Sequence, residues 1–129
     1  MPTVKTALLL IAHGSREPEA NGDLYALADQ LRRDQAYLCV EASFLELAQP
    51  GIEEGAWRCV VQGAERVILL PYFLSAGVHV RRDLTACRER LAAQFRQIDF
   101  RLAQPLGRHR LLVEIVRARA AESAEGNAS

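Results

Sequence analysis

Residues 7–16 read Ala7-Leu8-Leu9-Leu10-Ile11-Ala12-His13-Gly14-Ser15-Arg16. An unbroken apolar run of this length is typical of a strand that is buried on both faces of a parallel sheet. The run ends at His13, and Gly14 then allows the backbone to turn tightly and to approach a ligand closely. Open α/β sheets bind ligands beyond the carboxyl ends of their strands. The stretch therefore predicts a buried strand with an imidazole at the edge where such sheets bind ligands.

Strand-like and helix-like segments alternate along the rest of the chain. Strands are predicted at 7–12, 37–44, 66–72 and 98–102, and helices at 18–33, 52–62, 80–96 and 107–121. This alternation predicts an α/β fold, namely a three-layer α/β/α domain whose right-handed crossovers build a parallel sheet of four strands. We expect residues 1–121 to form this single domain and the polar residues 122–129 to form a disordered tail.

Composition narrows the classes of function. The 129 residues are 50% hydrophobic and 25% charged, with a formal net charge of zero, so neither nucleic acid nor a membrane surface is an expected partner. No apolar run approaches the roughly 20 residues that span a bilayer, and the first residues do not resemble a signal peptide. We therefore expect a cytoplasmic protein.

Arginine and cysteine usage give two further indications. Lys5 is the only lysine among sixteen basic residues, and the planar fork of arginine suits a small molecule that carries several carboxylates or phosphates. Genomic base composition and solvated helix faces could also explain the arginines.

Cys39, Cys59 and Cys87 are odd in number and widely spaced, which argues against a disulfide framework and a structural zinc site. We expect each to be a small buried residue.

A second histidine follows the third predicted strand. The stretch reads Pro71-Tyr72-Phe73-Leu74-Ser75-Ala76-Gly77-Val78-His79-Val80-Arg81-Arg82-Asp83. An apolar wall beside a lone imidazole suits a flat apolar ligand with a polar centre, although a buried loop with a hydrogen-bonded His79 would look the same. If the first strand is central, His13 and His79 face each other across a crevice. Imidazole binds metal ions and accepts protons near neutral pH.

Glu46 lies on the same predicted edge, because it directly follows the second strand. A carboxylate between apolar residues there could complete a metal site, relay protons, or simply stand at the entry to the next helix. His109, between Arg108 and Arg110, has neither an apolar wall nor a glycine loop beside it. We expect His109 to be a surface residue.

Three motifs in order resemble the sirohydrochlorin chelatases, the small class II tetrapyrrole chelatases of the CbiX type. They are Ala12-His13-Gly14-Ser15-Arg16, Phe44-Leu45-Glu46-Leu47-Ala48-Gln49-Pro50, and the stretch from Pro71 to Leu84. The similarity covers most of residues 6–118. One departure is Thr85, which stands where many relatives have proline.

The resemblance implies insertion of Co²⁺, Fe²⁺ or Ni²⁺ into sirohydrochlorin or a related tetrapyrrole, with the ion as substrate and no tightly bound cofactor. It implies that His13, His79 and Glu46 bind the ion and accept protons. Short members of the family pair as homodimers, so the working cleft would hold histidines from two subunits. Substrate contacts are then expected from Ser15, Arg16, Tyr72, Phe73, Leu74, Ser75, Ala76, Gly77, Arg81 and Arg82.

Two other functions fit parts of the pattern. A carrier of tetrapyrrole or metal could retain the fold without catalysing turnover, although both histidines argue for catalysis. A strand followed by His-Gly also occurs in histidine phosphatases, but there an arginine precedes the histidine and here the residue is Ala12.

Overall fold

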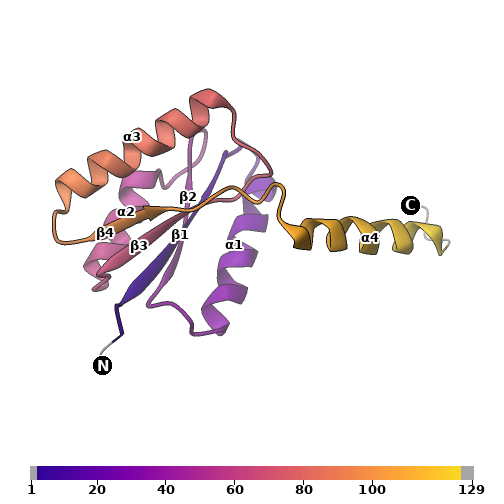
Figure 1. Cartoon of the computed structure of the whole chain (residues 1–129), viewed down its shortest axis with the longest axis horizontal. Helices are drawn as coiled ribbons and strands as arrows, with labels where there is room; N and C mark the ends of the chain where they lie inside the picture. The colour runs from indigo at the N-terminus through magenta and orange to yellow at the C-terminus, as the bar shows by residue number, and fades with distance from the viewer. Residues whose placement is uncertain (1–2, 126–129) are drawn as a thin grey trace.

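The computed structural model describes residues 3–125 and contains alternating strands and helices (Figure 1). The strands are β1 (Thr6–Ala12), β2 (Val40–Phe44), β3 (Arg66–Pro71) and β4 (Asp99–Leu102). The helices are α1 (Pro18–Arg33), α2 (Ile52–Val61), α3 (Val78–Gln94) and α4 (Arg110–Ala124).

All four strands pair in parallel, in the order β2-β1-β3-β4. The apolar β1 lies between two neighbours, with Leu8 opposite Val40 on one side and Ile68 on the other. The prediction of a four-stranded parallel sheet is confirmed. Because β1 is central, its carboxyl end lies where the chain crosses from one side to the other, which is the usual position of a ligand site.

The two faces of the sheet are covered differently. Leu9, Ile11 and Leu69 point into a core under α2 and α3, which contribute Cys59 and Leu84. On the opposite face, α1 packs over β1 and β2 through buried side chains that include Leu24 and Ala28. The fourth helix covers neither face: α4 extends away from the body (Figure 1), and none of the described residues of α4 is buried.

Element boundaries shift by a few residues from the predicted ones. The second strand begins at Val40 rather than at residue 37, although Leu38 already donates a backbone hydrogen bond to the carbonyl of Thr6 (2.8 Å). Helix α3 begins at Val78, so His79 lies in its first turn rather than in the loop before it. Helix α4 continues to Ala124, beyond the predicted end at residue 121, and residues 126–129 of the predicted tail lie outside the described residues.

The cysteines partly match the prediction. Cys59 and Cys87 are buried, whereas Cys39, the residue before β2, is only half-buried. Among residues 3–125, no helix combines the length and apolar character needed to cross a membrane.

Candidate active site

Two loops join at the carboxyl ends of β1 and β2. Leu45 donates its N–H to the carbonyl of Ala12 (2.9 Å), and Glu46 donates to the carbonyl of His13 (3.0 Å). Gly14 permits this contact, because its φ is +97° and a Cβ atom there would collide with the carbonyl oxygen of Glu46. The backbone thus holds His13 and Glu46 side by side, with both side chains exposed at the sheet edge.

The imidazole of His13 also packs against the segment that follows β3. The rings of His13 and Phe73 stack, with centroids 4.5 Å apart and planes inclined by 30°. Phe73 is itself fixed, because its carbonyl accepts the N–H of Leu106 (3.1 Å) and its neighbour Tyr72 donates to the carbonyl of Ile11 (2.6 Å). The orientation of His13 therefore depends on the loops after three different strands.

A cavity of about 480 Å³ opens beside His13 and Glu46, between the start of α2 and one face of α3. This volume is within the range of small-molecule sites. Its walls are built from His13, Phe44, Leu45, Glu46, Gly51, Ile52, Glu53, Val80, Asp83, Leu84, Cys87 and Arg90. Apolar side chains therefore share this lining with the imidazole of His13 and with four charged side chains, Glu46, Glu53, Asp83 and Arg90. Tyr72, Phe73 and Leu74, which the sequence predicted as an apolar wall, do not line it.

The α3 residues of this cavity follow helical spacing. Asp83, Cys87 and Arg90 recur at intervals of four and three residues and so share one face of the helix. Burial raises the pKa of the Cys87 thiol, so Cys87 contributes a neutral thiol to the wall near neutral pH. Arg90 reaches across to α2, where its Nε lies 3.9 Å from Oε1 of Glu53.

His79 does not line this cavity. It is exposed in the first turn of α3, four residues before Asp83, and therefore lies on the same helix face one turn nearer the sheet edge. Within residues 3–125, no three His, Cys, Asp or Glu side chains are close enough together to form a metal site. In the single chain, His13 and Glu46 are brought together and His79 lies apart from them.

Apart from Phe73, which stacks on His13, the predicted substrate-binding residues divide into three groups. Ser15 and Tyr72 line a smaller hollow of about 250 Å³ on the α1 side of His13. The hydroxyl of Ser15 also accepts the N–H of Glu17 (3.0 Å), which helps to shape the turn before α1. Arg81 and Arg82 line a different hollow on the outer face of α3, together with Thr85.

The third group lies in the loops around the site. Arg16 is exposed after the His13 loop, and Leu74, Ser75 and Gly77 are exposed between β3 and α3, with Ala76 half-buried among them. The predicted substrate-binding residues therefore do not share one pocket but lie in several hollows and loops.

Of the twelve residues that line the cavity, only His13 and Glu46 were predicted as site residues, and the titratable side chains that sequence reasoning missed are Glu53, Asp83, Cys87 and Arg90. Three of them form a stripe on α3, and this spacing was visible in the sequence. What the sequence did not indicate was that this face of α3 lies opposite the loop that carries Glu46. His109, expected at the surface, is exposed, and its Nδ1 accepts the N–H of Leu111 (3.1 Å) at the start of α4.

Comparison with known proteins gives consistent results. The family model CbiX matches residues 7–123. The sirohydrochlorin cobaltochelatase of Priestia megaterium is 38% identical over 97% of this chain, and the chloroplastic sirohydrochlorin ferrochelatase of Arabidopsis thaliana is 35% identical over 87%. These matches cover only 40% and 50% of the relatives, so the chain spans about half the length of the curated relatives it matches.

A solved structure of similar length has the same fold. The CbiX protein of Marinobacter aquaeolei VT8 superposes with a TM-score of 0.79 and 31% identity, over 93% of this chain and 98% of that one. The family match covers nearly the whole chain, including the loops that carry His13 and Glu46 and the first turn of α3, which carries His79. The chain belongs to the CbiX family.

Proposed function

We propose that this protein inserts a divalent metal ion, Co²⁺, Fe²⁺ or Ni²⁺, into sirohydrochlorin or a closely related tetrapyrrole. The observation that carries the proposal is the pairing of His13 and Glu46 at the open end of the cavity, held by the hydrogen bond from Glu46 N–H to His13 C=O. The names of the cobaltochelatase and ferrochelatase relatives support the same reaction.

Metal insertion requires one change to the metal ion and one change to the macrocycle. Water must be removed from the ion, and two protons must leave the pyrrole nitrogens as two metal–nitrogen bonds form. Imidazole and carboxylate are suitable ligands for a borderline divalent ion, and a neutral imidazole also accepts a proton near pH 7. In this proposal, His13 and Glu46 hold the incoming ion, and both are exposed to solvent that can take away the displaced water.

His79 is assigned to the macrocycle side of the reaction. Its exposed position in the first turn of α3, one turn before Asp83 of the cavity, supports this assignment, because a ring lying over the sheet edge is expected to reach this end of the helix. It accepts one pyrrole proton while His13 and Glu46 release the ion to the ring nitrogens, and the second pyrrole proton passes to solvent at the exposed sheet edge. Phe73 and Tyr72 supply apolar contact for the ring, and Arg16 is assigned to a peripheral carboxylate. Arg81 and Arg82, in the hollow on the outer face of α3, are assigned to carboxylates that extend beyond the cavity.

The test is a single-turnover assay of purified protein with metal-free sirohydrochlorin and each of Co²⁺, Fe²⁺ and Ni²⁺. Insertion is followed as loss of the metal-free absorption spectrum. We expect at least one ion to react much faster with protein than without it. Uncatalysed rates for every ion would contradict the proposal.

A carrier function on the same fold gives a different time course. With substrate in excess, a carrier produces a burst equal to the amount of protein and then stops. An enzyme continues for many turnovers. A histidine phosphatase would instead form phosphohistidine at His13 and hydrolyse phosphate esters.

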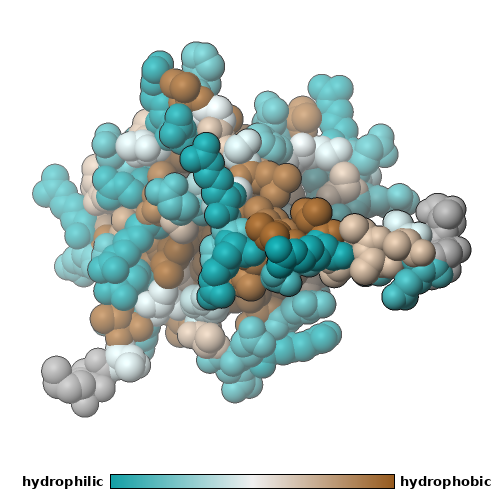
Figure 2. All heavy atoms as spheres, turned by 45° about the vertical axis from the view of Figure 1, so that its right-hand side comes forward, coloured by the Kyte–Doolittle hydropathy of each residue, from teal (hydrophilic) through white to brown (hydrophobic). Residues whose placement is uncertain are grey.

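We further propose that the working form is a homodimer in which α4 packs on a second copy of the chain. Leu111, Val113, Ile115 and Val116 of α4 are each at least half exposed, which is costly for apolar side chains in water. In Figure 2, apolar residues also gather on the body of the protein next to the base of α4.

The same chain has a surface that such a helix can cover. On the α1 side of the sheet, α1 packs over β1 and β2, and Ile68 and Leu70 of β3 remain partly exposed. Two copies that exchange α4 would cover both surfaces through a symmetric interface. The Marinobacter protein of similar length and the relatives of about twice this length are consistent with a unit that functions in pairs.

A further inference from the structure

The cavity beside His13 has an uneven charge distribution. Glu46, Glu53 and Asp83 contribute three carboxylates to its lining, whereas Arg90 is the only lysine or arginine among the residues that line it. A cavity dominated by carboxylates suits a metal cation but repels a substrate that carries carboxylates of its own. Arg90 is therefore the one group in this lining that attracts such a substrate by charge.

His13 and Arg90 line the same cavity, with Arg90 far along α3 from the start of the helix. Val80 and Arg90 line the same cavity on α3, and the rise of an α-helix separates their backbones by about 15 Å. The ring-binding wall of Phe73 and His13 is at the sheet edge, and Arg90 is further along α3. A ligand that contacts both this wall and Arg90 must be long. A macrocycle with peripheral side chains meets this requirement, because those side chains extend outward from the ring.

The present partner of Arg90 holds it weakly. The Arg90–Glu53 distance of 3.9 Å is long for an ion pair, and both side chains are about two-thirds exposed (63% and 68%). Exposed pairs of this kind contribute little to stability. Another carboxylate that offers two oxygens to the planar guanidinium can therefore replace Glu53 at low cost.

We propose that Arg90 is a specificity residue that binds a peripheral carboxylate of the tetrapyrrole and exchanges Glu53 for it when the substrate enters. This inference rests on the substrate class of the proposed function, but it concerns binding and not metal insertion. Glu53 acts in the opposite sense: its negative charge competes for Arg90 and repels the incoming carboxylate.

The test measures binding without metal, using fluorescence of two metal-free porphyrins. Uroporphyrin carries carboxylates on all sides of the ring, and mesoporphyrin carries them on one side only. We expect Arg90→Ala to weaken uroporphyrin binding about tenfold and to change mesoporphyrin binding much less. Arg90→Lys, which keeps the charge but loses the fork, gives an intermediate loss. Glu53→Gln tightens uroporphyrin binding roughly threefold, because the competitor is removed.

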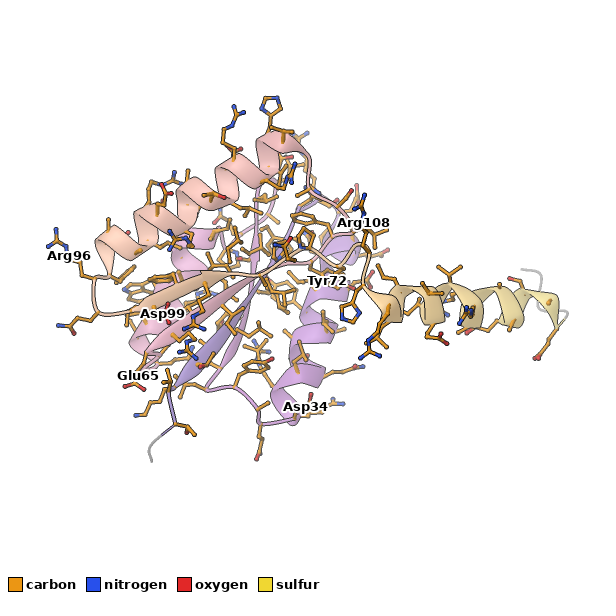
Figure 3. All side chains as sticks on the ribbon, viewed as in Figure 1. Asp34, Glu65, Tyr72, Arg96, Asp99 and Arg108 are labelled. Carbon is orange, nitrogen blue, oxygen red and sulfur yellow. The ribbon has the colours of Figure 1, made fainter. Side chains whose placement is uncertain are left out.

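Arg96→Ala is the matched control. Figure 3 shows Arg96 at the far end of α3, and it lines a separate hollow with Phe95 and Ile98. An equal loss of affinity in Arg96→Ala and Arg90→Ala would overturn the proposal, because it would reflect overall charge. Wild-type affinity in Arg90→Ala would overturn it directly. In contrast, absence of metal insertion by the wild type, with the predicted binding pattern intact, would count against the proposed function alone.

Discussion

Gly14 is the residue on which the contact between the loops that carry His13 and Glu46 depends. Its φ of +97° is unfavourable for other residues, and a Cβ there would collide with the Glu46 carbonyl. We expect Gly14→Ala to lower the free energy of unfolding by about 2–4 kcal/mol and to separate His13 from Glu46. Urea denaturation measures the first effect, and the insertion rate measures the second.

Gly22→Ala serves as the matched control for that change. Gly22 lies inside α1, and a Cβ there meets no atom within 4 Å. Alanine should stabilise the helix by about 0.5–1 kcal/mol and leave the insertion rate unchanged. Equal destabilisation by Gly14→Ala and Gly22→Ala would contradict the special role assigned to Gly14 in the contact between the loops.

The side chain of His79 is exposed, so its substitution should affect activity without affecting the stability of the fold. If it accepts a proton during insertion, His79→Ala should lose more than about tenfold in rate, as is typical for removal of a general base. The thermal unfolding midpoint should change little. His109→Asn is the control: it removes an imidazole but retains a side chain that can cap α4, so it should keep the wild-type rate. Wild-type activity in His79→Ala would exclude the role assigned to it.

Strands β3 and β4 are linked at their amino ends by an exposed ion network. Asp99 accepts hydrogen bonds from Arg66 Nε (3.1 Å) and Arg101 Nε (3.0 Å). Figure 3 shows Asp99 near Glu65 and far from Tyr72, at the edge of the sheet opposite the site. The bond from Arg66 is the main reason that the pKa of Asp99 lies below its ordinary value of 3.8.

This shift predicts a pH-dependent effect on stability. A carboxyl group with a lowered pKa in the folded state stabilises the fold above its unfolded pKa, and this contribution is lost as pH falls through the folded pKa. Asp99→Asn should therefore be slightly less stable than wild type at pH 7, and the difference should fade below about pH 4. Urea denaturation at pH 7 and at pH 2.5 measures it. A difference that persists at the lower pH would contradict the assignment.

At the scale of the whole molecule, the exposed apolar face of α4 predicts self-association. Val116 is 66% exposed on α4, and Val61 is 58% exposed on α2. If α4 packs on a second copy, Val116→Glu should convert the dimer to a monomer in light scattering and reduce insertion activity. Val61→Glu introduces the same charge outside α4 and should leave the dimer intact. A wild-type chain that is monomeric at micromolar concentration would contradict the exchanged-helix arrangement.

The periodicity of the sequence was sufficient to predict most elements. The apolar run from Ala7 to Ala12 is typical of a strand covered on both faces, and the apolar stripe that includes Leu24 and Ala28 favours a helix packed on that sheet. Boundaries were less certain, because residues such as His79 can begin a helix or end a loop with similar local energies. Helix α3 includes His79 because Gly77, in an extended conformation, starts the helix at Val78.

The sequence by itself determined the parallel α/β fold, the carboxyl-edge position of His13 and the loop that carries Glu46, because burial of apolar runs and glycine geometry are local properties. Only the tertiary structure decided which side chains share the cavity. It placed Asp83 and Arg90 there and left His79 one turn outside it. The reason is that a cavity depends on how α2 and α3 pack across the sheet, and this packing joins residues far apart in the chain. Within residues 3–125, it also left every side chain of α4 unburied, which no local pattern could predict.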